Sequence, residues 1–349
     1  MDILNGSGRS GLAAYCDLRS DAGPIHARVA ADLGAKLLAG ESFPFYQTAT
    51  PALLRVWISL ESPDIPVLND PRELSREHRS PEWEFLCGQV DAWPDLPPAQ
   101  QLRVVKVLAK LAFWEVIVDL IAPGDDADAE FEVQRLRSQR DTALLHLDAD
   151  DHRARAGIEA FGVRTATDAT LPASVRLSAA LNLVVSKARS SGGADAAEPW
   201  ATLAESLLPQ VPDEGEGLLL RSVCWRGISY VPHLRGDRET TRRRLDNAED
   251  FAVRALAQAS LSAQENMIPI LQTRARAAWD CGDLDAAHNY YRRLADHDPL
   301  DPSGCLRLAE FLFRTDRAAD ARTVYLRAAA LGTPDRSYAL AQAARCAVL

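Results

Sequence analysis

The amino-acid sequence predicts an all-α protein, built as a stack of antiparallel helical hairpins of the α-solenoid type. Apolar residues recur at spacings of three and four through most of the 349 residues, which is the period of an amphipathic helix. Runs of alternating β-branched residues between hairpin turns, the pattern of strands, are almost absent. Near the C-terminus, Ala287 and Ala321 are separated by 34 residues, and so are Tyr291 and Tyr325. A period of this length is typical of a repeated helix–turn–helix unit.

The individual helices are expected to follow one another with short turns. Most of them start beside a proline, whose missing N–H costs nothing in the first helical turn. In order, they are expected at about 25–39, 51–60, 81–90, 102–121, 126–147, 172–189, 199–208, 216–230 and 240–259. The stretch 102–121 is the most hydrophobic, but five charged residues interrupt it, which predicts a buried core helix and not a membrane span. Residues 61–80 and 190–197 are expected to connect helices.

The last third of the chain carries the most specific pattern. Gly282 permits a turn between two helices, and Ala287 is small enough to let them approach closely. Tyr291 would fill the space between neighbouring units, and Pro299 would end the second helix. With these four residues at these spacings, the segment resembles a tetratricopeptide repeat.

The resemblance implies one repeat at 268–301 and a second at 302–335. The second departs from the pattern, because Asp316 stands at the position of the turn glycine. Residues 336–349 are expected to form a further first helix or a terminal cap. For the whole chain we expect a flexible N-terminal segment at 1–23, an irregular helical domain at 24–190 and a helical-repeat domain at 198–349.

Composition narrows the classes of partner. The formal net charge is −10 and the pI is near 5.3, which argues against direct binding of nucleic acid through a basic field. No secretory signal or membrane span is recognised, so we expect a cytoplasmic protein with no membrane partner. The six cysteines contain no CxxC pair, and no cofactor is expected. Arginine far outnumbers lysine, a bias that we interpret as the mark of a GC-rich bacterial genome.

The resemblance also implies a binding surface, because first helices in this family line a concave groove that receives peptides or protein segments. The groove candidates are Gln272, Arg276, Asp280, Arg307, Glu310 and Arg314. The alternative is that these are ordinary solvated side chains. The Lys/Asn clamp that some family members use for a peptide carboxylate is not matched, so arginine would have to hold such a group.

One basic cluster suggests an anion-binding site. Arg238, Arg242 and Arg243 fall at the start of an expected helix, where positive charge is unfavourable. The alternative is a solvated face on which nearby acids, such as Asp246 and Glu249, neutralise the arginines.

No metal site is expected, but two groups of residues contain potential ligands. His146, Asp148, Asp150 and His152 form the densest group, which also fits the end of one helix and the cap of the next. The acidic run at 125–130 fits either a magnesium site or the first turn of a helix. The GxGxxG match at 6–11 lacks the preceding strand of a dinucleotide site.

Together these observations favour a bacterial adaptor or regulatory protein that binds a protein or peptide in a helical-repeat groove. The alternative is an enzyme in an all-helical scaffold that acts on a charged substrate containing phosphate or peptide groups. A third hypothesis is a regulatory module that acts on a transcription factor or a biosynthetic enzyme. Exposed repeat ends can stack between subunits, which allows a homodimer.

Overall fold

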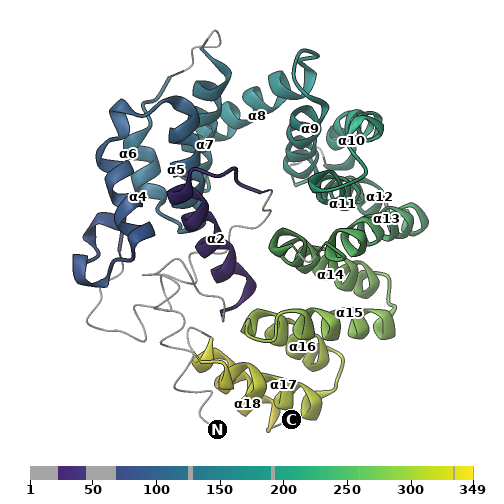
Figure 1. Cartoon of the computed structure of the whole chain (residues 1–349). Helices are drawn as coiled ribbons and strands as arrows, with labels where there is room; N and C mark the ends of the chain where they lie inside the picture. Colours follow the sequence, from purple (N-terminus) through teal and green to yellow (C-terminus); the bar gives the residue numbers. More distant parts are fainter. Residues whose placement is uncertain are drawn as a thin grey trace. The chain divides into compact units, whose positions relative to one another are not determined.

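The computed structural model describes residues 23–44, 68–124, 129–189, 193–258, 260–332 and 335–348, and Figure 1 labels their helices. Within these ranges the regular structure is helical and no strand occurs, so the all-α prediction is confirmed. Neighbouring helices pack in succession, as expected of an α-solenoid. Packing divides the described chain into two compact units, one within 23–43, 68–149 and 284–348, the other formed by residue 44 and by 150–283.

The expected domains are stretches of chain and not packing units, and their boundaries at 24–190 and 198–349 stay a prediction. The expected N-terminal segment 1–23, the helix at 51–60 and the acidic residues at 125–128 lie outside the described residues, apart from Gly23.

The described N-terminal part of the first unit is formed by α2 (Ile25–Ala39), α4 (Pro81–Asp91), α5 (Pro98–Lys110), α6 (Trp114–Leu120) and α7 (Phe131–Leu147). Short 3₁₀ turns lie at Pro71–Glu73, Arg76–His78 and Trp93–Asp95. Helix α4 illustrates how local sequence determines the residue at which a helix begins. Pro81 occupies its first turn, and Ser80 Oγ accepts a hydrogen bond from the Trp83 N–H at 3.1 Å.

The prediction of one continuous helix over 102–121 is wrong, because the chain turns between α5 and α6. Ala112 has a φ of 56°, and the Phe113 N–H bonds to the Leu108 carbonyl at 3.0 Å, which ends α5 in a left-handed turn. The turn places the Phe113 ring, which is fully buried, with its centroid 5.9 Å from that of Trp83. Burial of this ring offsets the cost of an alanine at positive φ.

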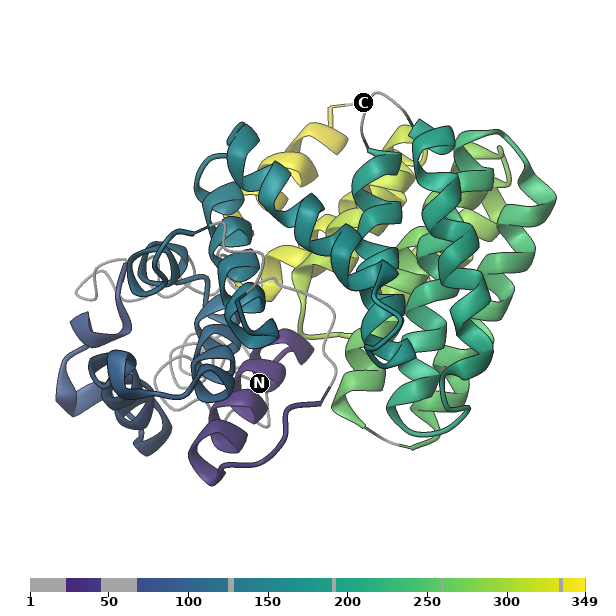
Figure 2. The ribbon, with the colours of Figure 1, turned by 90° about the horizontal axis from the view of Figure 1, so that it is seen from above.

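The second unit contains α8 (His152–Thr167), α9 (Ala173–Ala188), α10 (Gly193–Leu207), α11 (Glu216–Ile228), α12 (Tyr230–Leu234), α13 (Arg238–Leu256) and α14 (Leu261–Asp280). Its successive helices lie side by side (Figure 2). One apolar core joins α9 to α12. The expected connector at 190–197 is wrong from Gly193 onward, because α10 starts there. Ala197, Ala201 and Ala204 are fully buried at helical spacing, so this segment packs as a helix face.

The C-terminal part of the first unit consists of α15 (Leu284–His297), α16 (Pro302–Arg314), α17 (Ala318–Ala330) and α18 (Arg336–Cys346). The residues that define the 34-residue period occupy equivalent environments. Ala287 and Ala321 are both fully buried, and Tyr291 and Tyr325 are both buried. A Cβ at Gly304 would lie 3.0 Å from the Ala295 Cα, so α15 and α16 approach too closely there for a side chain.

The turns that end α14 and α16 are also equivalent. Gly282 has a φ of 80° and Asp316 a φ of 60°. In each turn the following N–H bonds to the carbonyl five residues earlier, at 2.9 Å. Aspartate tolerates the left-handed conformation better than most residues, so the missing glycine leaves the turn intact.

None of the described helices is both long and apolar enough to cross a membrane. The five described cysteines are free, and four of them are buried: Cys87, Cys224, Cys305 and Cys346. Burial raises the pKa of Cys87 to about 11 and that of Cys224 to about 12. These thiols therefore pack as small apolar side chains.

Candidate functional site: the repeat surface and a histidine–aspartate cluster

Helix α16 presents a charged strip to solvent. Its start is fixed by Asp301, whose Oδ1 accepts a hydrogen bond from the Ser303 N–H at 2.9 Å. Arg307, Glu310 and Arg314 share one face, because they are three and four residues apart. Both arginines are exposed, and Arg314 forms an ion pair with Glu310 at 2.6 Å. We call these three residues the α16 strip.

Helix α14 carries the other three groove candidates. Arg276 and Asp280 are exposed and Gln272 is half-buried, at spacings that place all three on one face. Asp280 Oδ2 lies 3.4 Å from His233 Nε2. Helix α14 belongs to the second unit and α16 to the first, so the six candidates form two strips. Their union in one groove stays a prediction.

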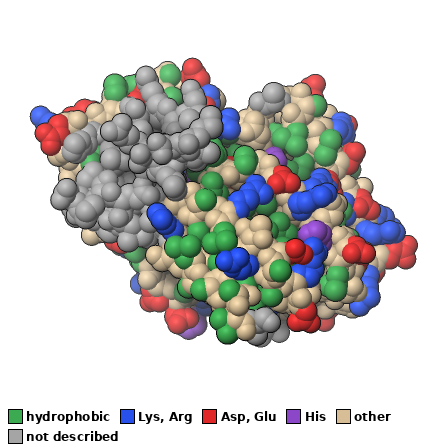
Figure 3. Space-filling view, turned by 90° about the horizontal axis from the view of Figure 1, so that it is seen from below, with side chains coloured by type: hydrophobic (Ala, Val, Ile, Leu, Met, Phe, Trp, Pro, Cys, Tyr) green, Lys and Arg blue, Asp and Glu red, His purple; other side chains and the backbone are tan. Residues whose placement is uncertain are grey.

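Two arginines beside the basic cluster at the start of α13 form ion pairs with acids that the sequence analysis did not name. Arg235 and Arg244, which flank the cluster, both pair with carboxylates of α10. Arg238, Arg242 and Arg243 are exposed, and none of the three pairs with an acid in the described part of the chain. On the face shown in Figure 3, basic and acidic side chains are interspersed with apolar ones.

The predicted ligand candidates around residue 150 do not gather into one group among the described residues. The His146 ring stacks on Trp114, with centroids 4.0 Å apart and planes 6° apart, and burial lowers the pKa of His146. Asp148, Asp150 and His152 are exposed. The segment ends α7 and starts α8, where Asp151 caps the new helix, as the alternative interpretation expects.

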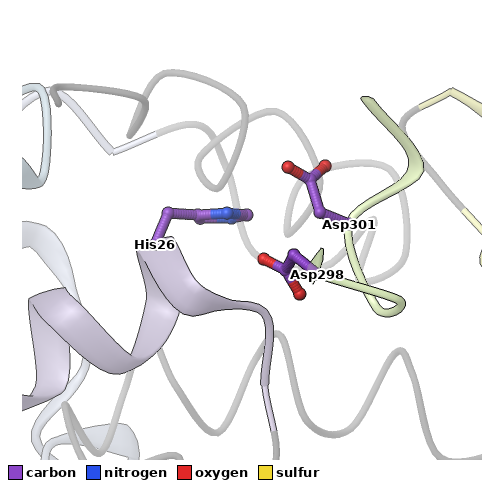
Figure 4. Close-up of side chains that lie close together, drawn as sticks. All are labelled: His26, Asp298 and Asp301. Carbon is purple, nitrogen blue, oxygen red and sulfur yellow. The ribbon is translucent and has the colours of Figure 1, made fainter. Parts of the chain in front are cut away.

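A different group of potential ligands, missed by the sequence analysis, lies in the first unit. His26 is in the first turn of α2, and Asp298 and Asp301 are in the turn between α15 and α16. One donor atom of each residue lies within 4.8 Å of the other two, and Figure 4 shows the three side chains close together. We call these three residues the His26 cluster.

Sequence reasoning had little chance of finding this cluster. Asp298 reads as the end of one helix and Asp301 as the cap of the next. His26 is separated from both by most of the chain. The one local pattern that could have indicated the cluster is Asp298-Pro299-Leu300-Asp301, which places two acids in one short turn. The third residue, His26 on α2, is brought to this turn by tertiary structure alone.

Asp298 joins the two elements of the cluster directly. Its Oδ2 accepts a hydrogen bond at 2.8 Å from the Ile25 N–H, 273 residues away in the chain. Pro24, the residue before α2, provides no side-chain cap, so Asp298 satisfies an N–H that the helix leaves open. The N-terminus of α2 is therefore held to the repeat turn by a buried carboxylate.

The environment of these carboxylates is negative and partly shielded from water. Burial, and then the charge of Asp301, raise the pKa of Asp298, although the hydrogen bond from Ile25 and the nearby His26 act in the opposite direction. Burial and the charge of Asp301 also raise the pKa of Asp335, which precedes α18. Burial and the neighbouring charge of Asp301 therefore both disfavour the ionised form of Asp298 and of Asp335.

The geometry of α15 to α18 agrees with comparison to known proteins. Residues 278–345 match the family model described as "Tetratricopeptide repeat". No curated protein matches the chain. The match covers both equivalent residue pairs, Ala287 with Ala321 and Tyr291 with Tyr325. The C-terminal part of this protein therefore consists of tetratricopeptide-like helical repeats.

Proposed function

We propose that the protein is an adaptor or regulatory protein that binds a peptide or protein segment through the α16 strip. The observation that carries this proposal is the repeat match at 278–345, because such repeats generally mediate protein–protein interactions. Helix α16 is the first helix of the second repeat, the position that lines the groove in this family. Stacked repeats leave an extended surface that suits an elongated partner.

The charges of the strip suggest the chemistry of the partner. Arg307 and Arg314 are exposed and present guanidinium groups that can bind a carboxylate in a bidentate manner. Glu310 already pairs with Arg314, which leaves Arg307 as the cation offered to a partner. We therefore infer a partner segment with acidic side chains. The proposal extends to Gln272, Arg276 and Asp280 on α14, the first helix of the preceding repeat.

The setting that we propose is the cytoplasm of a bacterium. The free thiols of the described cysteines fit a reducing compartment, and the strong preference for arginine over lysine fits a GC-rich genome. Within the described residues, Asp148 and Asp150 are exposed and join no group of potential metal ligands, and Arg238, Arg242 and Arg243 are exposed, so we rank the alternative of an enzyme acting on a charged substrate through these residues second.

The test is capture of partners from the native host with the full-length protein, followed by titration calorimetry with each recovered partner. The variant is the double change Arg307→Glu with Arg314→Glu. The matched control is Arg322→Glu, a charge reversal at an exposed position of α17, the second helix of the repeat. We expect the double variant to lose the partner and the control to keep it.

Circular dichroism shows whether both variants remain folded, which the exposure of the changed residues predicts. Recovery of the same partners with the same affinity by the wild type and the double variant would contradict the proposal. Equal loss in the double variant and in Arg322→Glu would show that overall charge, and not the α16 strip, governs binding.

A further inference from the structure

We propose that the His26 cluster binds one divalent transition-metal ion of the zinc class, which links α2 to the turn between α15 and α16. The ligands are one imidazole nitrogen from His26 and one carboxylate oxygen each from Asp298 and Asp301. Zinc accepts this combination of nitrogen and oxygen donors. The imidazole favours zinc over magnesium and calcium, which prefer oxygen donors alone. The site is independent of the α16 strip.

The separation of the donor atoms fits a metal better than it fits direct pairing. The three atoms lie within 4.8 Å of one another, yet no ion pair joins His26 to either carboxylate among the described residues. In tetrahedral coordination with metal–ligand distances of about 2.0–2.2 Å, donor atoms lie about 3.3–3.6 Å apart. To bind an ion, the three donors would have to move from within 4.8 Å of one another to that separation.

Both carboxylates are already oriented by other hydrogen bonds. Asp298 accepts from the N–H of Ile25 at 2.8 Å and from the N–H of Leu300. Asp301 accepts from the Ser303 N–H at 2.9 Å and from the Ser303 hydroxyl at 2.6 Å. Hydrogen bonds of this kind fix the direction of metal ligands and raise metal affinity. Each oxygen keeps a second lone pair for a metal ion.

The surroundings of the cluster favour a cation. Asp298 is 6% exposed, and the charge of Asp301 acts on both Asp298 and Asp335. Two carboxylates therefore lie close to one histidine in a region partly removed from water, and a third, Asp335, interacts with Asp301. A divalent ion would offset their mutual repulsion, and Asp335 would contribute charge without serving as a ligand.

Three protein donors leave one position of a tetrahedral site for water. His26 and Asp301 are half-buried, so solvent reaches that side of the cluster. An ion held from both sides would tie the N-terminal helix α2 to the repeats, and binding would stabilise the folded chain.

The test uses the full chain, stripped of metal with a chelator and then titrated with Zn²⁺ in a calorimeter. We expect one site per chain and a rise in melting temperature on adding Zn²⁺. Co²⁺ should give the visible absorption of a four-coordinate site, whereas Mg²⁺ and Ca²⁺ should bind far more weakly. His26→Ala and Asp301→Asn should each weaken Zn²⁺ binding by more than about tenfold, since even residues that only orient metal ligands change affinity by that factor.

Two features of these variants keep the test decisive. Asparagine at position 301 still caps α16, so a loss of Zn²⁺ binding in Asp301→Asn does not come from a lost helix start. Asp335→Asn should weaken binding only a few-fold, because it removes charge and not a ligand. The matched control is His152→Ala, which removes an exposed histidine of the second unit and should leave the affinity unchanged.

Failure to bind Zn²⁺ at a defined stoichiometry would overturn the proposal and leave Asp298 as a helix cap alone. Equal Zn²⁺ affinity in the wild type and His26→Ala would also overturn it, because the ion would then be held by other surface histidines. Neither outcome depends on the partner-capture experiment, which tests the α16 strip.

Discussion

The C-terminal repeats at 284–348 and the helices of the second unit at 150–283 are both stacks of antiparallel helices, but different side chains hold them together. In the repeats, paired small and aromatic residues are buried at a spacing of 34, as with Tyr291 and Tyr325. In the second unit, Ser222 Oγ donates to the Ala248 carbonyl at 2.7 Å and accepts from Asn266 Nδ2 at 3.0 Å, all buried.

A second polar contact strengthens the contrast. Arg274 is almost fully buried and reaches two acids of α13, Asp246 at 2.6 Å and Glu249 at 2.9 Å. These are the acids that the sequence analysis assigned to the arginines of α13. The buried residue pairs of the repeats recur at a spacing of 34, whereas these polar contacts join individual residues of α11, α13 and α14. Repetition, and not helix packing itself, therefore makes a helical stack recognisable from sequence.

The largest expected effect tests whether the two repeat tyrosines are equivalent. Tyr291→Ala and Tyr325→Ala should each lower the free energy of unfolding by about 3 kcal/mol, because each removes a buried ring and leaves a cavity. Urea denaturation measures the change. Tyr325→Phe keeps the ring and serves as the control, with an expected loss below about 1 kcal/mol. A cost at only one of the two positions would break the equivalence of the repeats.

The next effect concerns the close approach of α15 and α16. Gly304→Val should cost about 2 kcal/mol, because the new Cβ meets backbone atoms at 3.0–3.1 Å, which cannot move aside as a flexible side chain does. Gly88→Val in α4 is the control, since a Cβ there meets nothing within 4 Å. Thermal melts of Gly304→Val and Gly88→Val compare the stabilities of the two variants. Equal stability of both would show that the repeats tolerate wider helix spacing.

A smaller effect is expected from the polar core of the second unit. Ser222→Ala should cost about 1–2 kcal/mol, because the Asn266 amide loses its acceptor in a buried place. Ser206→Ala, at an exposed hydroxyl of α10, is the control and should change stability little. Hydrogen exchange of α11 and α13 locates the effect. An unchanged free energy of unfolding in Ser222→Ala would remove the proposed contrast between the two regions.

The smallest effect is a dependence of the repeats on pH. Burial, and then Arg317 and Arg292, lower the pKa of His288, whose ring stacks on Phe311 at 6.2 Å. The unfolded chain therefore takes up the proton first as the pH falls. The neutral His288 ring therefore contributes to the free energy of unfolding at pH values above the ordinary histidine pKa of about 6.5. This contribution is lost as the pH falls through the lower pKa that His288 has in the folded state.

His288→Gln removes this titration, so the stability difference between wild type and variant should shrink between pH 7.5 and pH 5. Urea denaturation across that range, with an NMR titration of the His288 ring, measures it. A stability difference that stays constant with pH would contradict the prediction.

Part of this structure follows from local sequence and part does not. The bounds of α2 match their prediction, and the turn at Gly282 was predicted from the glycine itself. The break at Ala112 and the start of α10 at Gly193 were not, because the sequence around each of them is compatible with other conformations. In both cases the burial of apolar side chains selects the conformation. Phe113 is buried after the break at Ala112, and the alanine face of α10 is buried in the helix that starts at Gly193.

The candidate sites divide in the same way. The residues of the α16 strip were named from the resemblance to tetratricopeptide repeats, and their role in binding stays a prediction. That they share one helix face follows from helical spacing, which is a local property. The ligand candidates between His146 and His152 are also close in sequence, yet their side chains do not converge. Short spacing in sequence is therefore informative for a shared helix face and poor evidence for a ligand group across a turn.

The helical fold, the 34-residue period of the C-terminal helices and the residues that pack between those helices could all be predicted from the sequence. The position of His26 beside Asp298 and Asp301, and the ion pairs of Arg274 with Asp246 and Glu249, depend instead on tertiary structure. The difference arises from how far apart in the sequence the interacting residues lie. Helix period and turn chemistry act within a few residues, whereas contacts between distant segments depend on the packing of every helix between them.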